Sequence, residues 1–118
     1  MKYYRLYIDS DSKTYPLISE ILGVKPLEFD KEDENRTWCY GIEENEDDEL
    51  PYLDFINIFL DILEPKFTEL QNIGIQRENI TIWKIYGYDM QCAMEFTPQE
   101  MKRLGENGIT FCIDCFQR

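Results

Sequence analysis

The chain has 118 residues, with 24 acidic and 12 basic side chains, and a formal charge of −12 at pH 7. This negative excess argues against direct binding of nucleic acid or an anionic membrane surface, because both would repel it, and favours a basic protein as partner. The length fits one domain over residues 1–118, and a hydrophobic content of 43% predicts a packed globular core.

The cysteines and the N-terminal segment bear on the compartment. The opening "MKYYRLYIDSDS" lacks the apolar stretch of a signal peptide, and no apolar run approaches the roughly 18 to 20 residues of a membrane span. Cys39, Cys92, Cys112 and Cys115 fit a reducing compartment as small core residues, although an even number could also form two disulfides in a secreted chain. Without a signal peptide, we expect a cytoplasmic protein.

The first half of the chain predicts two strands and one helix. Residues 3–9 alternate between apolar and polar side chains, which is typical of a strand. Residues 14–23 place apolar side chains at helical spacing and end in Gly23, which can close a helix. Residues 37–42 alternate again around Trp38 and predict a second strand.

The middle of the chain carries the longest helical pattern, from about residue 51 to residue 73. Pro65 should kink or split this helix, because its ring removes a backbone donor and clashes with the preceding turn. Residues 79–87 and 91–96 then predict two strands joined as a hairpin.

The C-terminal segment predicts a helix and a last strand. A capping box at Thr97 opens a helix over residues 97–108, with Met101 and Leu104 expected to face inward, and residues 109–116 read as a strand. The order β-α-β-α-β-β-α-β predicts an α+β two-layer sandwich. Its sheet should be largely antiparallel, with about five strands and the helices on one face.

The sequence carries little catalytic equipment. It contains no histidine, no glycine-rich phosphate loop and no nucleophile elbow, so we expect no enzyme. Cys112 and Cys115 have the spacing of redox and zinc motifs, but in a strand residues three apart point to opposite faces. A zinc site would also need Cys39 and Cys92, each isolated in the sequence. We therefore interpret the cysteines as structural and expect no metal and no cofactor.

The densest charged feature is the stretch "IEENEDDEL", with six carboxylates in seven positions over residues 43–49. Three interpretations compete: a surface for a basic partner, a solvated loop and a metal site, in that order. On the helix that follows, acidic residues recur three or four positions apart and share one outward face. The predicted partner-binding residues are the acids of the run and of this face, with one tyrosine as an aromatic anchor: Glu43, Glu44, Glu46, Asp47, Asp48, Glu49, Tyr52, Asp54 and Asp61.

Solvation alone is the closest competitor, because loops and outward helix faces are often charged. It accounts less well for a face that is almost wholly acidic, with Lys66 only at its far end. Acids at a helix N-terminus gain only a few tenths to about 1 kcal/mol, and only within the first turn. Mixed charges at helical spacing would stabilise the fold better.

Three segments together resemble a family of small bacterial domains of unknown function: "ISEILGVKP", "RTWCY" and "FTPQEMKRLGENGITFCIDCF". The resemblance covers most of the chain, and its motifs look structural. It implies that Gly23 and Pro26 fix a turn, that Trp38 packs and that Asp114 lies in the last strand. It implies no catalytic residues.

By type, the chain also resembles the acidic immunity proteins of bacterial polymorphic-toxin and contact-dependent inhibition systems. Such proteins bind and block a co-encoded toxin, commonly a basic nuclease. The resemblance implies an immunity protein, or antitoxin, that neutralises a basic toxin through its acidic surface. The alternative is a non-catalytic ligand-binding or regulatory module with a pocket between sheet and helices, and a homodimer is compatible with either.

Overall fold

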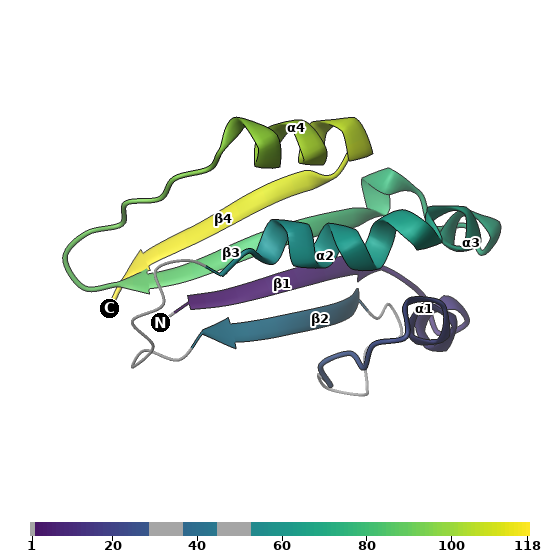
Figure 1. Ribbon diagram of the computed structural model, residues 1–118. Coiled ribbons are helices and arrows are strands. Elements are labelled where there is room, and N and C mark those ends of the chain that lie inside the picture. The colour runs from purple at the N-terminus through teal and green to yellow at the C-terminus, as the bar shows by residue number, and fades with distance from the viewer. Residues whose placement is uncertain (1, 29–36, 45–52) are drawn as a thin grey trace.

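The computed structural model describes residues 2–28, 37–44 and 53–118, which form one four-stranded mixed sheet with helices on one face (Figure 1). The strand order is β2-β1-β3-β4. β1 pairs antiparallel with β2 and β3, whereas β3 and β4 are parallel. The α+β class is confirmed, with four strands in place of about five. The strands are β1 (Lys2–Asp9), β2 (Thr37–Glu44), β3 (Ile80–Tyr88) and β4 (Thr110–Gln117).

The helices follow the local signals of the sequence. A 3₁₀ turn that contains Pro65, η1 (Glu64–Lys66), divides the long helical pattern as predicted. Gly23 and Gly108 close α1 and α4 with φ values of 70° and 66°, a conformation that glycine adopts without a Cβ clash. The described helices are α1 (Thr14–Leu22), α2 (Phe55–Leu63), α3 (Phe67–Asn72) and α4 (Pro98–Asn107), with a second 3₁₀ turn, η2 (Arg77–Asn79).

The core lies between the sheet and the helices. Tyr4, Leu6 and Ile8 of β1 point into it, as their alternation predicted. Trp38 of β2 is fully buried, and its Nε1–H donates a hydrogen bond of 2.9 Å to Ser19 Oγ of α1. The largest buried side chains of α2 pack against the same face: Phe55, Ile56, Phe59, Leu60 and Leu63.

The predicted inward face of α4 is partly wrong. Leu104 is 7% exposed, as expected, but Met101 is 56% exposed. Glu100 turns inward instead, because its carboxylate accepts hydrogen bonds from the amide and hydroxyl of Thr97 in the capping box. Capping geometry therefore sets the rotation of this helix.

The predicted hairpin strand at residues 91–96 is also wrong. This segment has no regular structure, although its side chains alternate between more and less exposed positions. The Phe96 ring packs on Phe111 of β4 with centroids 5.0 Å apart. β1 and β4 occupy both edges of β3, so no edge remains for a hairpin partner. The alternating exposure of residues 91–96 therefore reflects the packing of their side chains and not hydrogen-bonded pairing with a neighbouring strand.

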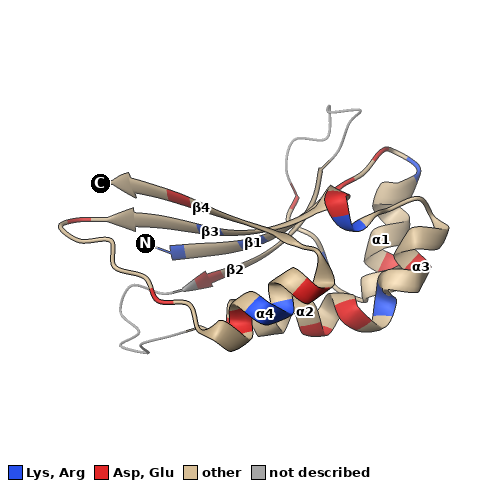
Figure 2. Cartoon of the chain, turned by 90° about the horizontal axis from the view of Figure 1, so that it is seen from above, with Lys and Arg blue, Asp and Glu red and all other residues tan. Residues whose placement is uncertain are grey.

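In Figure 2, α2 and α4 lie along one face of the sheet and α1 and α3 lie beyond the ends of its strands, so no described helix covers the second face, although Cys39 of β2 is buried there. The second face carries the side chains that alternate with the core positions, and several are aromatic. Tyr7 of β1 and Trp83 of β3 pack edge to face, with ring centroids 6.3 Å apart. This uncovered face and the helix layer thus present surfaces of different chemistry.

Candidate functional site

The described residues include only part of the predicted partner-binding surface. Glu44 belongs to β2, but its side chain is not described. Glu43, Asp54 and Asp61 have described side chains, and all three are exposed. The remaining predicted residues lie outside the described part of the chain: Glu46, Asp47, Asp48, Glu49 and Tyr52.

Glu43 does not join the acidic face of α2. It lies opposite Tyr3 of β1, on the sheet face that the helices leave uncovered. Its carboxylate is 3.9 Å from Arg5 Nη2, and its side chain is 70% exposed. Strand alternation thus directs Glu43 away from the helix layer. Residues 45–52, which would connect Glu43 to Asp61, lie outside the described residues, so the continuous acidic surface stays a prediction.

The acidic face of α2 is crossed by a basic side chain of α4. Arg103 donates hydrogen bonds to Asp61 Oδ1 at 2.7 Å, to both carboxylate oxygens of Glu64 at 3.0 Å and to Asn57 Oδ1 at 2.6 Å. Figure 2 shows the basic turn of α4 beside the acidic positions of α2. The helix face is thus less acidic than the sequence of α2 alone suggests.

The charges of this contact remain in place at neutral pH. Hydrogen bonds from Arg103, and then from Asn107, lower the pKa of Glu64. The same bond to Glu64, and then that to Asp61, raises the pKa of Arg103. Asp61 stays 71% exposed although it pairs with Arg103. The net charge of this cluster is −2, because the guanidinium of Arg103 offsets one of three carboxylates, those of Asp54, Asp61 and Glu64.

Sequence reasoning missed Arg103 because it lies 42 positions from Asp61. The available signal was the adjacent pair Lys102 and Arg103 on a predicted helix, in a chain with few basic residues. A basic pair on one helix indicates that an acidic side chain of another segment could lie nearby. Only the packing of α4 on α2 shows that these acids are Asp61 and Glu64.

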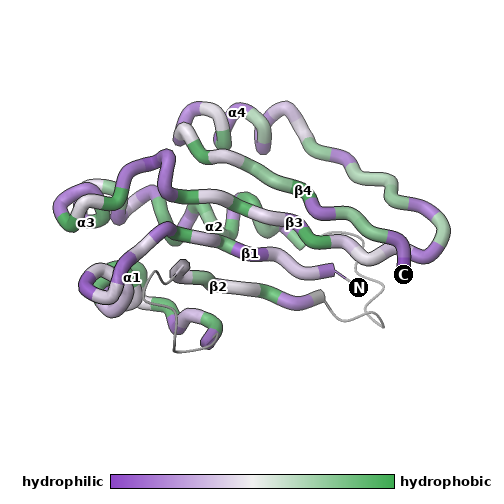
Figure 3. Tube along the Cα trace, turned by 180° about the vertical axis from the view of Figure 1, so that it is seen from behind, coloured by the Kyte–Doolittle hydropathy of each residue, from purple (hydrophilic) through white to green (hydrophobic). Residues whose placement is uncertain are grey.

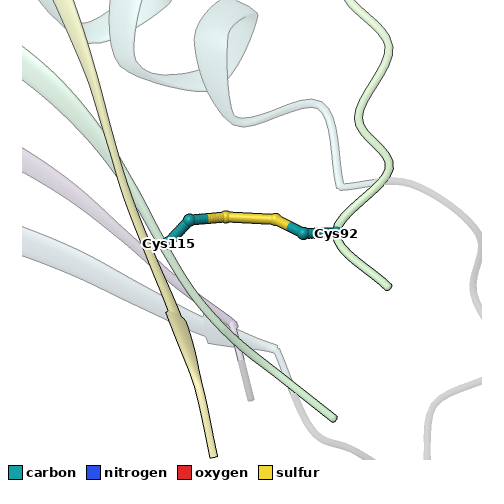
Figure 4. The surroundings of a disulfide bond; sticks show 2 residues. All are labelled: Cys92 and Cys115. Carbon is teal, nitrogen blue, oxygen red and sulfur yellow. A yellow bond between two sulfur atoms is a disulfide. The ribbon is translucent and has the colours of Figure 1, made fainter. Parts of the chain in front are cut away.

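The cysteines differ from the prediction in one respect. A disulfide joins Cys92 and Cys115, which lie 23 positions apart (Figure 4), whereas we expected structural thiols. Cys39 is buried and free, and burial chiefly raises its pKa to about 11, so it stays protonated. Cys112 is also free, and the strand register places it on the sheet face opposite to Cys115.

The described residues contain no group of three or more histidine, cysteine or acidic side chains arranged to hold a metal ion.

A cavity of about 580 Å³ lies between the sheet, the segment before α4 and the first turn of α4. Lys84 of β3 is only 9% exposed, and its Nζ lies 5.6 to 5.9 Å from the ring centroids of Tyr4, Tyr86 and Phe96. Lys2 Nζ is 5.4 Å from the Tyr86 centroid. Two ammonium groups and an aromatic ring therefore border one cavity. The residues that line it are Lys2, Lys84, Tyr86, Ala93, Met94, Glu95, Thr97 and Glu100.

Comparison with known proteins finds no matching family model, no similar curated protein and no similar solved structure. Within the described ranges, no helix has the length and apolar character needed to traverse a bilayer.

Proposed function

We propose that this protein is a cytoplasmic immunity protein, an antitoxin that binds and neutralises a cognate basic toxin. The observation that carries the proposal is the charge of −12, from 24 acidic against 12 basic side chains. The described acidic side chains stay exposed to solvent even where they form ion pairs: Glu43 is 70% exposed and Asp61 is 71% exposed. A strongly basic protein is the partner that such a surface attracts.

A nuclease domain is the toxin that fits best. Its active cleft is lined with cations because it must bind a phosphate backbone, and a row of carboxylates can occupy the same positions. Opposite net charges also accelerate encounter, by 10- to 1,000-fold in steered complexes, and this gain falls as salt rises. The protein would act by covering the cleft.

The proposed contact is the acidic run together with the acids of α2. Arg103 holds Asp61 and Glu64 in place on this face and removes one unit of negative charge from it. Glu43 lies on the other sheet face and would contact the partner only at the margin. The residues of the proposed contact are Glu44, Glu46, Asp47, Asp48, Glu49, Tyr52, Asp54 and Asp61.

An affinity pull-down of the tagged protein from its native host, washed in low and then high salt, tests the function. We expect one basic protein with a nuclease-like domain, retained less as salt rises. Several unrelated proteins, or none when the neighbouring genes are expressed, would contradict an immunity function.

Reversal of Glu46, Asp47 and Asp48 to lysine tests the contact. We expect the association rate with the captured toxin to fall at least about tenfold at physiological salt, because the steering charge is inverted. The melting temperature should change little. The matched control reverses Glu20, Glu28 and Glu78, which are exposed and lie elsewhere, and should slow association much less. Equal effects of the two triple variants would show that only net charge matters.

The cavity beside Lys84 favours a second function, a ligand-binding module. Lys2 and Lys84 share this cavity with the carboxylates of Glu95 and Glu100, so its charges balance, and Tyr86 with Met94 adds apolar surface. Such a lining suits a small zwitterion that carries an apolar group. We expect phenylalanine to raise the melting temperature of the protein, and Lys84→Met to abolish the rise. Lys102→Met, which removes a 76% exposed lysine of α4, is the control. No shift with phenylalanine, or an equal shift in both variants, argues against this site.

A further inference from the structure

The segment between β3 and α4 returns along the outer edge of β4 (Figures 1 and 3). We call its residues 90–96 the strap. One end of the strap follows Asp89, whose carboxylate lies 3.3 Å from Arg118 Nε, and the other end precedes the capping box at Thr97. Within the described residues, no backbone hydrogen bond joins the strap to a strand or a helix. Its position between the two ends therefore depends on its side chains.

Two side-chain contacts attach the strap to β4. Close to α4, the ring of Phe96 packs on the ring of Phe111, with centroids 5.0 Å apart. Further from α4, the disulfide joins Cys92 of the strap to Cys115 of β4 (Figure 4). The disulfide is a covalent bond, so it fixes the part of the strap that the aromatic contact does not reach.

The strap also forms one wall of the cavity beside Lys84. Lys84 is 9% exposed, and its Nζ lies 5.9 Å from the ring centroid of Phe96. Cys115 is the register partner of Tyr86, which lines the cavity, so both side chains lie on the same face of the sheet. The residues that directly follow Cys92 supply the wall: Ala93, Met94 and Glu95. The disulfide thus holds a wall of the cavity against the sheet.

The disulfide is open to chemical attack. Cys115 is exposed and Cys92 is partly exposed, and exposed disulfides are commonly the labile, regulatory ones. Cys39 lies in β2 at the opposite edge of the sheet, and Cys112 points to the other sheet face, so neither is placed to exchange with this pair. In a reducing cytoplasm, the compartment proposed above, a disulfide is usually transient or redox-sensing.

We propose that the Cys92–Cys115 disulfide is a redox latch, which a thiol reductant cleaves to release the strap and open the cavity beside Lys84. A thiolate of the reductant attacks the exposed sulfur of Cys115 and forms a mixed disulfide, and Cys92 leaves as a thiolate that takes up a proton. A second thiolate of the reductant then displaces Cys115, which is protonated in turn. Two electrons pass to the cysteine sulfurs, and the reductant leaves as its disulfide.

The latch does not depend on the proposed immunity function. As a control of ligand binding it rests on the second proposed function, because the strap lines the cavity in which the ligand would bind. Release of the strap can be measured without any ligand. Phenylalanine binding and opening of the cavity are therefore separate results, and either can fail alone.

Acetylation of lysines in the folded full chain by an N-hydroxysuccinimide ester, read by mass spectrometry, tests the latch. One sample is first reduced with dithiothreitol and its thiols are blocked with iodoacetamide, and the other receives iodoacetamide alone. We expect Lys84 to react at least about fivefold faster in the reduced sample, because the strap no longer buries it. Lys102, which is 76% exposed, should react equally in both. Equal rates at Lys84 would contradict the proposal.

The buried thiol of Cys39 separates opening of the latch from unfolding of the domain. After reduction, iodoacetamide should modify Cys92 and Cys115 and leave Cys39 unmodified. Modification of Cys39 at the same rate would mean that reduction unfolds the whole domain, which overturns a local latch. A disulfide that an excess of reduced glutathione cannot cleave in the folded protein would be structural and would also overturn it.

Two serine variants show whether the disulfide itself controls access to the cavity. In Cys92→Ser, Lys84 should react at the fast rate with or without dithiothreitol. Cys112→Ser removes a free thiol of the same strand and should respond to dithiothreitol like the unmodified chain. Slow labelling of Lys84 in Cys92→Ser would show that other contacts close the cavity, and would refute the latch.

Discussion

Replacement of Trp38 by alanine is expected to lower the free energy of unfolding by about 3 to 5 kcal/mol, as measured by chemical denaturation. Trp38 is fully buried between β2 and the helix layer, so truncation leaves a large cavity. The change also removes the hydrogen bond to Ser19 Oγ and with it a link between β2 and α1. In a small domain whose total stability is about 5 to 15 kcal/mol, this loss is a large fraction.

Trp83 provides the matched control because it is the second of the two tryptophans. It lies on the uncovered sheet face, is only partly buried and packs edge to face on Tyr7. Trp83→Ala should therefore cost less than Trp38→Ala, about 1 to 3 kcal/mol, since part of its surface is already in water. A loss as large as that of Trp38→Ala would mean that the uncovered face is buried in solution.

Replacement of Arg103 by methionine is expected to lower the free energy of unfolding by about 2 kcal/mol at neutral pH. The Arg103 side chain is 25% exposed and links α4 to Asp61 and Glu64 of the helix–turn segment. Without it, the two carboxylates lose their common cation. Lys102→Met is the control, since Lys102 is 76% exposed and contacts Glu106 at 3.7 Å. Its cost should stay below about 0.5 kcal/mol.

The same contact predicts a dependence on pH. Arg103, and then Asn107, hold the pKa of Glu64 below its ordinary value in the folded protein. The folded pKa is thus lower than the unfolded one, so the stabilisation is complete above the unfolded value of about 4.3 and is lost as pH falls through the folded value. The stability difference between the unmodified chain and Arg103→Met should shrink as the pH falls below about 4.3. A difference that is constant with pH would exclude Glu64 as the cause.

The sequence by itself determined the elements whose signals lie within a few residues. The alternation of Tyr4, Leu6 and Ile8 identified β1 and its buried face, and the capping box at Thr97 located the start of α4. Pro65 divided the long helical pattern at the position expected. These predictions succeeded because periodicity, capping and the proline ring act through neighbouring atoms of one segment.

Only the tertiary structure decided which distant segments meet. β4, rather than residues 91–96, pairs with β3, and this choice depends on which sheet edge is vacant. The placement of Arg103 among the acids of α2 and of Glu43 on the opposite sheet face depends on helix rotation and strand register. These arrangements are set by the packing of the whole core. The sequence of one segment does not indicate which segment 20 to 40 residues away it will contact.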